Sequence, residues 1–431
     1  MAGKMKRGFS RFMKMRSNKI CLLFDESDNI TNPTAKRTKY SLSIFRRALY
    51  KMLGTGTSVR NNIPELYPQF EMMYNNSVNM MCMCQEVYYQ NRETGEIYNR
   101  WNDKYGYPFP ARGGFALFKS CFCPGRTSVF GIEKINQDIY NQDELWHLIR
   151  KTVITRSFRE IAGDKYTVLN HPVTPNDAEM AVYEKVLQEY EEIVYQHFTN
   201  SGDNRKESQL RMIRQIQLLI KACSIPESMS GYYGTQRPTK PKEILKEIGR
   251  VKGKVAVGCT THEALEMYVD YIRDHFPDRP LFIAHGKITI ARREKIVDSF
   301  EETTDGILVC TQQSLESSID IPTCNEVFLE SLQWNFPRME QFYFRFIRFD
   351  SEEHTYVRFF TNEKSIEQNL LALLLDKERL NDFVKTGEVA DEDQIYEQFG
   401  VSRSIVEQLY RKHKDNDGKA FITHWGNQRI S

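Results

Sequence analysis

The stretch KVAVGCTTHEALEMYVDYIRDHF, residues 254–276, decides the fold of the second half of the chain. It begins with a short valine-rich apolar run and continues with apolar residues at three- and four-residue spacing. The first pattern predicts a buried strand and the second an amphipathic helix. The alternation continues in RPLFIA (279–284), ARREKIVDSF (291–300) and GILVCT (306–311). Strands that alternate with helices predict a parallel sheet covered on both faces.

Two later runs, EVFLES (326–331) and TYVRFFT (355–361), extend this sheet. The first half repeats the pattern in fragments, with ICLLFD (20–25) as a strand, a helix near 41–50 and a second strand leading into LGTGTS (53–58). We therefore predict an α/β protein with two parallel-sheet lobes, helical insertions and a small helical C-terminal tail.

Composition shifts suggest where these parts begin and end. A long helical section runs from about 176 to 222, and the Pro-, Gly- and Ser-containing stretch 226–242 is typical of a linker. The predicted domains are 1–165, a first lobe with an insertion at about 75–140; 166–240, a helical protrusion and linker; 241–385, a second lobe; and 386–431, a tail.

The bulk composition is that of an ordinary soluble protein. Of 431 residues, 40% are hydrophobic and 27% are charged, with a net charge of +2, which by itself indicates no nucleic-acid partner. The sequence contains no run of about eighteen apolar residues, so it predicts no membrane-spanning helix. The basic segment 1–19 lacks the apolar core of a secretory signal. We expect a cytoplasmic protein with no membrane partner.

Nine cysteines, an odd number, fit reduced thiols better than a disulfide framework. Cys82-x-Cys84 and Cys121-x-Cys123 could enclose zinc with four thiolates. The spacing differs from the usual C-x2-C, however, and Cys82 and Cys84 lie in a Met-rich apolar stretch. The sequence therefore favours apolar packing of these cysteines over a zinc site.

Asp25 and Glu26 directly follow an apolar run. At the carboxyl end of a strand, one carboxylate can hold Mg²⁺ while its neighbour polarises a water molecule, the two roles that phosphoryl transfer requires. An isolated Asp-Glu pair is more often a solvated loop.

Further along, MEQFYFRFIRF (339–349) predicts a helix with Gln341, Arg345 and Arg348 on one face. Two guanidinium groups there can bind phosphate oxygens; the alternative is a basic surface helix. The phenylalanines of this segment, Phe349 included, indicate a largely buried helix, in which an arginine requires a partner.

The ordered set of motifs resembles the Snf-type DNA translocases and their phage relatives in helicase superfamily two. The stretches that carry it are DESD (25–28), NPTAKRTK (32–39), TGTS (55–58), GCTTHEA (258–264), AHGKITIARREKIVDSF (284–300), LVCTQQSLESSID (308–320) and QxxxRxxR (341–348). The resemblance covers about four fifths of the chain and implies an ATP-driven motor of two RecA-like lobes.

Position by position, the resemblance implies roles for residues of the first half. Asp25 and Glu26 would be catalytic and would bind ATP, with Asp25 as the Mg²⁺ ligand and Glu26 activating water. The residues that would couple hydrolysis to movement are Asp28, Thr55, Gly56 and Thr57.

In the second half, the resemblance implies that Gln341 and Asp320 contact the nucleotide and that Thr311 contacts nucleic acid. Arg345 and Arg348 would be catalytic, with Arg348 as the arginine finger. The sequence departs from the family pattern at several positions, which leaves room for a decayed member. These positions are Ser58, Leu315, Ser317, Ser318 and Phe344.

Family members place a phosphate-binding loop, G-x-x-x-x-G-K-[ST], well upstream of DESD. Here 24 residues precede Asp25, and Gly3-Lys4 does not qualify as a remnant of the loop, because Met5 follows it and both the upstream glycine and a preceding strand are lacking. That loop supplies backbone amides and a lysine to the phosphates. We therefore expect the first lobe to be N-terminally incomplete, with an unpaired apolar sheet edge, and a second polypeptide to supply the loop.

The segment 391–414 predicts a helix, a tight turn at Gly400 and a second helix, the layout of a helix-turn-helix. The second helix would present Arg403, Ser404 and Gln408 to DNA. The alternative is a helical hairpin packed on the motor.

These observations favour an ATP-dependent helicase or translocase of the Snf-like group, which uses ATP and Mg²⁺ and works on duplex DNA. The alternative is a truncated relative that binds DNA or a partner without hydrolysing ATP. Lack of the phosphate loop favours the alternative for the isolated chain, whereas DESD and the two arginines favour the enzyme for a completed system.

Overall fold

The computed structural model describes residues 2–56, 59, 63–75, 77, 79–91, 96–124, 139–156, 161–199, 204–315, 319–333, 336–349, 351, 353–368, 370–371, 412–414 and 420–422. The chain divides into two compact units. Unit 1 comprises 1–156 and 376–390, and unit 2 comprises 157–375 and 391–431.

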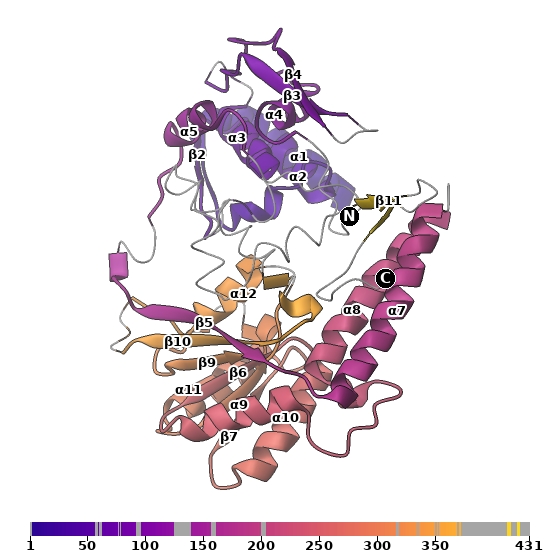
Figure 1. Ribbon diagram of the computed structural model, residues 1–431. Coiled ribbons are helices and arrows are strands. Elements are labelled where there is room, and N and C mark those ends of the chain that lie inside the picture. The colour runs from indigo at the N-terminus through magenta and orange to yellow at the C-terminus, as the bar shows by residue number, and fades with distance from the viewer. Residues whose placement is uncertain are drawn as a thin grey trace. The chain divides into compact units, whose positions relative to one another are not determined.

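Unit 1 is built around a pair of parallel strands (Figure 1). Its elements are α1 (Ala2–Arg16), β1 (Cys21–Phe24), α2 (Lys36–Phe45), β2 (Tyr50–Leu53), α3 (Leu66–Tyr74), β3 (Glu86–Gln90), β4 (Ile97–Trp101), α4 (Gly114–Phe122) and α5 (Gln142–Arg150), with short 3-10 helices at Ser17–Lys19, Ser27–Ile30 and Ile63–Glu65. β1 and β2 pair in parallel from Cys21 opposite Tyr50 to Phe24 opposite Leu53. Both predicted strands of the first half are therefore confirmed.

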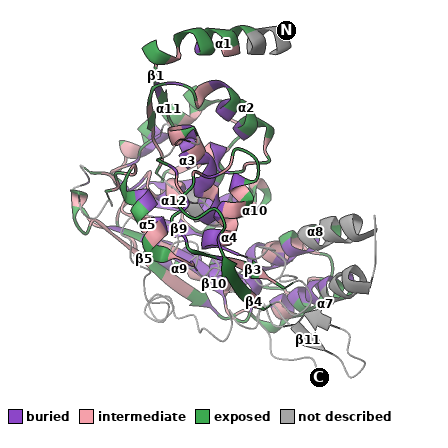
Figure 2. Ribbon diagram, turned by 90° about the horizontal axis from the view of Figure 1, so that it is seen from above, coloured by how far each residue is buried: buried purple, intermediate pink, exposed green. Residues whose placement is uncertain are grey.

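One face of this strand pair is buried and the other is exposed. Leu22 packs with Met13 of α1, Leu42 of α2 and Met72 of α3 in one apolar cluster. From residue 8 onward α1 is otherwise largely exposed, as Figure 2 shows. On the opposite face the exposed side chains are Leu23 (69%), Tyr50 (62%) and Met52 (64%).

The helix predicted near 41–50 begins earlier than expected, as α2 at Lys36. The reason is local, because Asn32 Oδ1 accepts hydrogen bonds from both the N–H (2.9 Å) and the hydroxyl (2.7 Å) of Thr34, which forms a turn just before the helix. The helix ends at Phe45, and Tyr50 already belongs to β2.

The predicted insertion contains an antiparallel hairpin of β3 and β4 and the helix α4. Its core packs Phe109 and Phe118 against Phe70 of α3 and Leu145 of α5. This cluster is separate from the one beneath β1 and β2. The insertion therefore shares a second core with α3 and α5.

Unit 2 contains a six-stranded sheet in the order β5-β10-β9-β6-β8-β7, with every neighbouring pair parallel (Figure 1). Its elements are β5 (Tyr166–Val173), α7 (Asp177–Thr199), α8 (Asn204–Ser224), α9 (Thr239–Arg250), β6 (Val255–Cys259), α10 (His262–His275), β7 (Leu281–Ala284), α11 (Ile290–Glu301), β8 (Ile307–Thr311), β9 (Glu326–Leu329), α12 (Phe336–Tyr343), β10 (Thr355–Asn362), β11 (Lys412–Lys414) and β12 (Ala420–Ile422), with 3-10 helices at Pro226–Ser228 and Gln312–Leu315. The predicted α/β architecture with a parallel sheet is confirmed.

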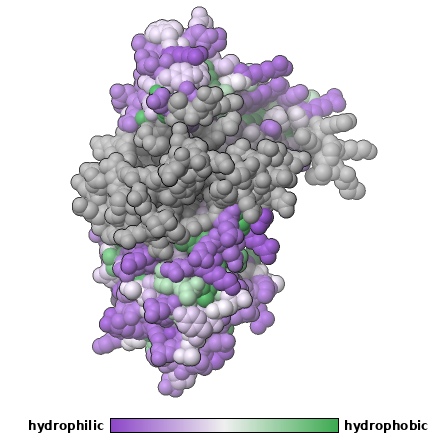
Figure 3. Space-filling model, turned by 45° about the vertical axis from the view of Figure 1, so that its right-hand side comes forward, coloured by the Kyte–Doolittle hydropathy of each residue, from purple (hydrophilic) through white to green (hydrophobic). Residues whose placement is uncertain are grey.

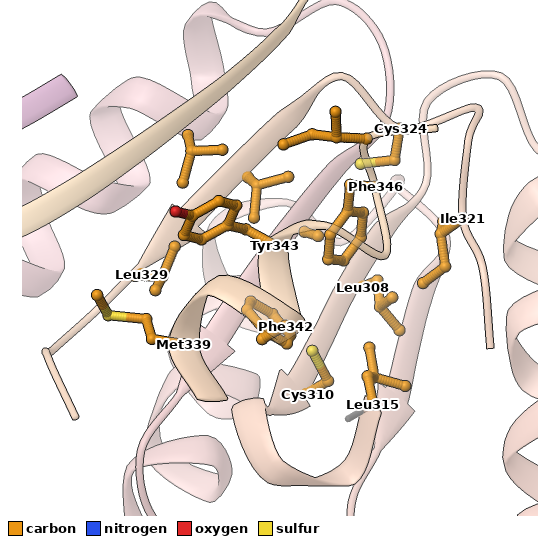
Figure 4. Packing of buried hydrophobic residues seen from close by; sticks show 14 of the residues in the cluster. Leu308, Cys310, Leu315, Ile321, Cys324, Leu329, Met339, Phe342, Tyr343 and Phe346 are labelled. Atoms are coloured by element: carbon orange, nitrogen blue, oxygen red, sulfur yellow. The ribbon is translucent and has the colours of Figure 1, made fainter. Parts of the chain in front are cut away.

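Alternate residues of the central strands face two different cores. On β8, Ile307 and Val309 pack in a cluster with α9 and α10, whereas Leu308 and Cys310 pack with α11 and α12. Figure 4 shows the second cluster, in which Phe342 lies among these side chains. The sheet is therefore covered on both faces, as the alternating strands and helices predict.

Strand β5 lies in the segment 166–240, which we expected to be a helical protrusion and linker. It pairs with β10 along its whole length, from Tyr166 opposite Thr355 to Val173 opposite Asn362. The helical part begins after it, where α7 and α8 run side by side as a hairpin (Figure 1). Residues 166–173 thus belong to the second sheet.

The predicted helix-turn-helix lies outside the described residues except at its end, where Lys412–Lys414 form strand β11 and pair with β12 instead of continuing a helix. On the face that Figure 3 shows, the described surface is mainly hydrophilic with small hydrophobic areas. Among the described helices, none is both long enough and apolar enough to cross a membrane.

Candidate functional site

The carboxyl ends of β1 and β2 bring the DESD segment beside Gly54, the residue that precedes the TGTS segment. Gly54 N donates to Phe24 O (2.9 Å), and Ser27 N donates to Gly54 O (2.9 Å). A Cβ added at Gly54 would stand 3.5 Å from Asp25 Oδ1. Two segments about thirty residues apart in the sequence, DESD and the residues that end β2, therefore meet at one sheet edge, because parallel strands end on the same side.

Glu26 has a left-handed backbone, with φ 52° and ψ 50°. Residues other than glycine rarely adopt this conformation, and such strain is concentrated at functional sites. The turn is held by Glu26 N, which donates to Asp25 Oδ1 (2.9 Å). Both side chains are exposed, whereas Asp28 is fully buried. The first two carboxylates are thus accessible to a ligand and the third is not.

Of the predicted coupling residues, Thr55 is half-buried and Gly56 is exposed with open space where a Cβ would stand. Thr57 lies outside the described residues. Behind them, Ser27 Oγ donates to Gln69 Oε1 of α3 (3.2 Å). This hydrogen bond connects the DESD segment to α3. The sequence analysis did not single out Ser27 or α3.

The donor set at this edge fits Mg²⁺. The ion prefers oxygen ligands and is usually held by one or two protein carboxylates together with waters and substrate phosphates. Asp25 supplies an exposed carboxylate directly after β1, and the missing side chain of Gly54 keeps space clear beside it. Asp25 would hold the ion, and the adjacent carboxylate of Glu26 would orient water.

In unit 2, one carboxylate gathers both predicted arginines. Asp320 Oδ1 lies 3.4 Å from Arg345 Nη1 and forms an ion pair with Arg348 Nη2. A backbone hydrogen bond from Ile321 N to Arg345 O (2.7 Å) fixes the two segments to each other. We call Asp320, Arg345 and Arg348 the Asp320 cluster. Its three side chains are partly exposed, by 52%, 20% and 34% respectively, so anionic groups can approach the guanidinium groups.

The helix expected to present these arginines ends too early for that role. α12 stops at Tyr343, so Gln341 lies on it, while Arg345 lies in the turn that follows and Arg348 lies just beyond that turn. The prediction that the three polar residues share one helix face is therefore wrong.

Backbone hydrogen bonds explain why the helix ends there. Arg345 N donates to Phe342 O (3.1 Å), which tightens the chain from α-helical to three-residue spacing. The carbonyl of Arg345 then accepts from Ile321 N instead of a residue further along a helix. The expectation that the arginines have a partner is confirmed by Asp320. Phe349, expected to be buried, is 66% exposed.

The remaining predicted residues are spread more widely. Thr311 is half-buried at the carboxyl end of β8, and its carbonyl accepts from Ser314 Oγ (2.7 Å). Gln341 is half-buried on α12. The three residues predicted to contact DNA from the tail lie outside the described residues; they are Arg403, Ser404 and Gln408.

Gln312 is a residue that the sequence analysis missed. Its side chain is buried, and Nε2 donates to Gly258 O (3.2 Å) and to Ser331 O (3.0 Å). It therefore ties together the carboxyl ends of β6, β8 and β9. A polar residue directly after a buried strand was the available signal.

A buried polar network lies at the same edge of the sheet. Glu330 accepts from Thr260 N (2.8 Å) and from Ser224 Oγ (2.6 Å), and burial raises the pKa of its carboxyl group. In the same unit, Lys240 Nζ donates to both carboxylate oxygens of Glu367 at 2.7 Å, with side-chain exposures of 2% and 0%. Sequence reasoning missed this pair because its members are 127 positions apart.

The Asp320 cluster lies in a part of the chain that matches a known protein family. Residues 239–350 match the family model of the helicase conserved C-terminal domain. The matched segment contains β6 to β9, α12 and all three members of the Asp320 cluster. This part of the chain is thus similar to helicases, and the resemblance inferred from its motifs is supported there.

Among curated proteins, a chloroplastic ATP-dependent DNA helicase of Arabidopsis thaliana is 27% identical over 166 residues. The match covers 38% of this chain and 20% of the plant protein, so the chain spans about a fifth of that helicase.

Two solved structures are similar in part. The C-terminal part of the Fun30 ATPase domain is 14% identical, with 55% of this chain and 99% of that chain covered and a TM-score of 0.40. The Sulfolobus solfataricus SWI2/SNF2 ATPase core in complex with dsDNA is 16% identical, with 92% and 76% covered and a TM-score of 0.42.

Proposed function

We propose that the protein is the ATP-hydrolysing and DNA-translocating part of a Snf-like helicase. The observation that carries the proposal is the Asp320 cluster, because two arginines gathered on one carboxylate lie inside the segment that matches the helicase C-terminal domain. The partial match to a DNA helicase supports DNA as the nucleic acid.

In this proposal two residues of unit 1 bind the metal ion and orient the attacking water. Asp25 holds Mg²⁺, which neutralises charge on the phosphates, and Glu26 accepts a hydrogen bond from the attacking water. The left-handed turn at Glu26 leaves its carboxylate exposed for that role. Arg345 and Arg348 neutralise phosphate charge, and Asp320 keeps their guanidinium groups in place between turnovers.

The 431 residues contain no G-x-x-x-x-G-K-[ST] sequence. We propose that a segment outside these 431 residues supplies this phosphate loop and that the segment covers the exposed face formed by Leu23, Tyr50 and Met52. Apolar side chains exposed together on a strand pair favour association. A cytoplasmic location accords with nine free cysteines.

The test is DNA-stimulated ATP hydrolysis by the chain alone and mixed with the polypeptide encoded immediately upstream, with Glu26→Gln as the control. The proposal is supported if the mixture hydrolyses ATP and the same mixture made with Glu26→Gln does not. Salt-dependent DNA binding without turnover in either sample would favour the alternative, a protein that acts by binding alone.

A further inference from the structure

We propose that Cys82, Cys84 and Cys121, completed by Cys123, form a structural zinc site in the insertion of unit 1. The sulfur atoms of the first three all lie within 4.8 Å of one another, and all three residues are buried. They come from two segments about forty positions apart in the sequence. The inference does not depend on the proposed helicase function.

The distances suit a metal better than a disulfide. In a tetrahedral zinc site with Zn–S bonds of about 2.3 Å, neighbouring sulfurs are about 3.8 Å apart. Cys82 Sγ and Cys121 Sγ are 3.4 Å apart. A disulfide requires about 2.05 Å. These sulfurs are therefore close enough to share one ion without being bonded to each other.

Asn102 supports the cluster in the way that outer ligands support metal sites. Its Nδ2 donates to Cys82 Sγ (3.0 Å) and to Cys84 O (2.8 Å), and its side chain is buried. An amide aimed at a sulfur stabilises a thiolate and fixes its orientation. Asn102 Oδ1 also accepts from Lys104 N (3.0 Å), so the same buried amide joins the turn after β4 to the first cysteine segment.

The second cysteine segment is fixed to the hairpin by another amide. Asn141 Nδ2 donates to Cys121 O (2.8 Å) and to the carbonyl of Glu86, the first residue of β3 (3.1 Å). The backbone of the first segment is held by Cys82 N, which donates to Tyr107 O (2.9 Å). Both segments are thus positioned without the ion, which lowers the entropic cost of binding it.

Cys123 is the fourth ligand in this proposal. It stands two positions after Cys121, directly after α4, and packs in the same apolar cluster as the other three. Its sulfur is not among the three that lie within 4.8 Å of one another. Coordination therefore requires a rotation of its side chain. The C-x-C spacing favoured apolar packing of these cysteines. The proposed zinc site is inferred instead from the positions of their sulfur atoms in the folded chain.

The experiment measures the zinc content of the full chain, purified under reducing conditions, by plasma mass spectrometry. We expect one zinc per chain, and much less in Cys84→Ser and Cys121→Ser. Cys310→Ser, which removes a buried cysteine of unit 2, is the matched control and should retain the zinc. Asn102→Ala should weaken zinc binding about 10–100-fold.

Because a cysteine variant can fail to fold, cobalt provides a second measurement on the unaltered chain. Removing zinc and adding Co²⁺ should give the thiolate-to-metal absorption of a tetrahedral site, at lower intensity in Cys123→Ser. A folded, reduced protein that binds neither ion would overturn the proposal. So would iron in place of zinc. Full zinc affinity in Cys123→Ser would remove that residue from the site.

Discussion

Asp320 forms an ion pair with Arg348 and at the same time lies 3.4 Å from Arg345. The three residues come from two segments that a backbone hydrogen bond joins, between Ile321 and Arg345. One partly exposed carboxylate thus holds two guanidinium groups beyond the end of α12.

If the protein hydrolyses ATP as proposed, Arg348→Ala should lower turnover about a thousandfold or more, the effect of removing an arginine that neutralises phosphate charge. Asp320→Ala should lower it less, and the double variant should resemble Arg348→Ala alone if the carboxylate acts by positioning the arginine. Asp270→Ala removes an exposed partner of Arg273 and serves as the control. Additive losses in the double variant would contradict the positioning role.

Glu26→Gln should abolish turnover while nucleotide and Mg²⁺ binding remain, because the amide keeps the shape of the side chain but cannot accept a proton. Binding is measured by calorimetry and turnover by phosphate release. Asp103→Asn, at a side chain that is 84% exposed, is the control. Unchanged turnover in Glu26→Gln would remove Glu26 from its proposed role.

Gly258→Ala should lower the free energy of unfolding by about 1–3 kcal/mol, the usual cost of overpacking a core. A Cβ there would stand 2.6 Å from Phe342 Cε1, where α12 packs closely against β6. At Gly286, a Cβ would meet nothing within 4 Å, so Gly286→Ala should change stability little. Urea unfolding measures both, and equal stabilities would show that Phe342 moves freely.

Lys240→Met should destabilise unit 2 by about 3–5 kcal/mol, because it leaves the carboxylate of Glu367 buried without its cation. Adding Glu367→Gln should recover part of the loss, since the neutral amide costs less to bury. Lys246→Met is the control, because Lys246 is 52% exposed and its pair with Glu243 should contribute little. Thermal unfolding gives the order of the three variants, and an equal loss in Lys240→Met and Lys246→Met would count against the buried pair.

The alternation of apolar strands and amphipathic helices was sufficient to predict the parallel sheet of unit 2. Strand β5 was not predicted because Tyr166–Val173 contains Asn170, His171 and Pro172, which interrupt its apolar pattern. Polar residues and proline are tolerated there because β5 is the edge strand, with β10 as its neighbour in the described sheet. Whether a strand lies at an edge depends on the order of strands in space, which local periodicity does not contain.

The sequence by itself determined that Asp25 follows a strand, that Arg345 and Arg348 require a partner, and that residues 254–311 alternate between strand and helix. These features depend on residues that are close together along the sequence, and the sequence alone gives that proximity. Only the tertiary structure decided that Asp320 is that partner, that Glu367 neutralises Lys240 and that three cysteines meet in the insertion. Each of these contacts joins residues far apart in the chain, and their distances are set by how strands and helices pack.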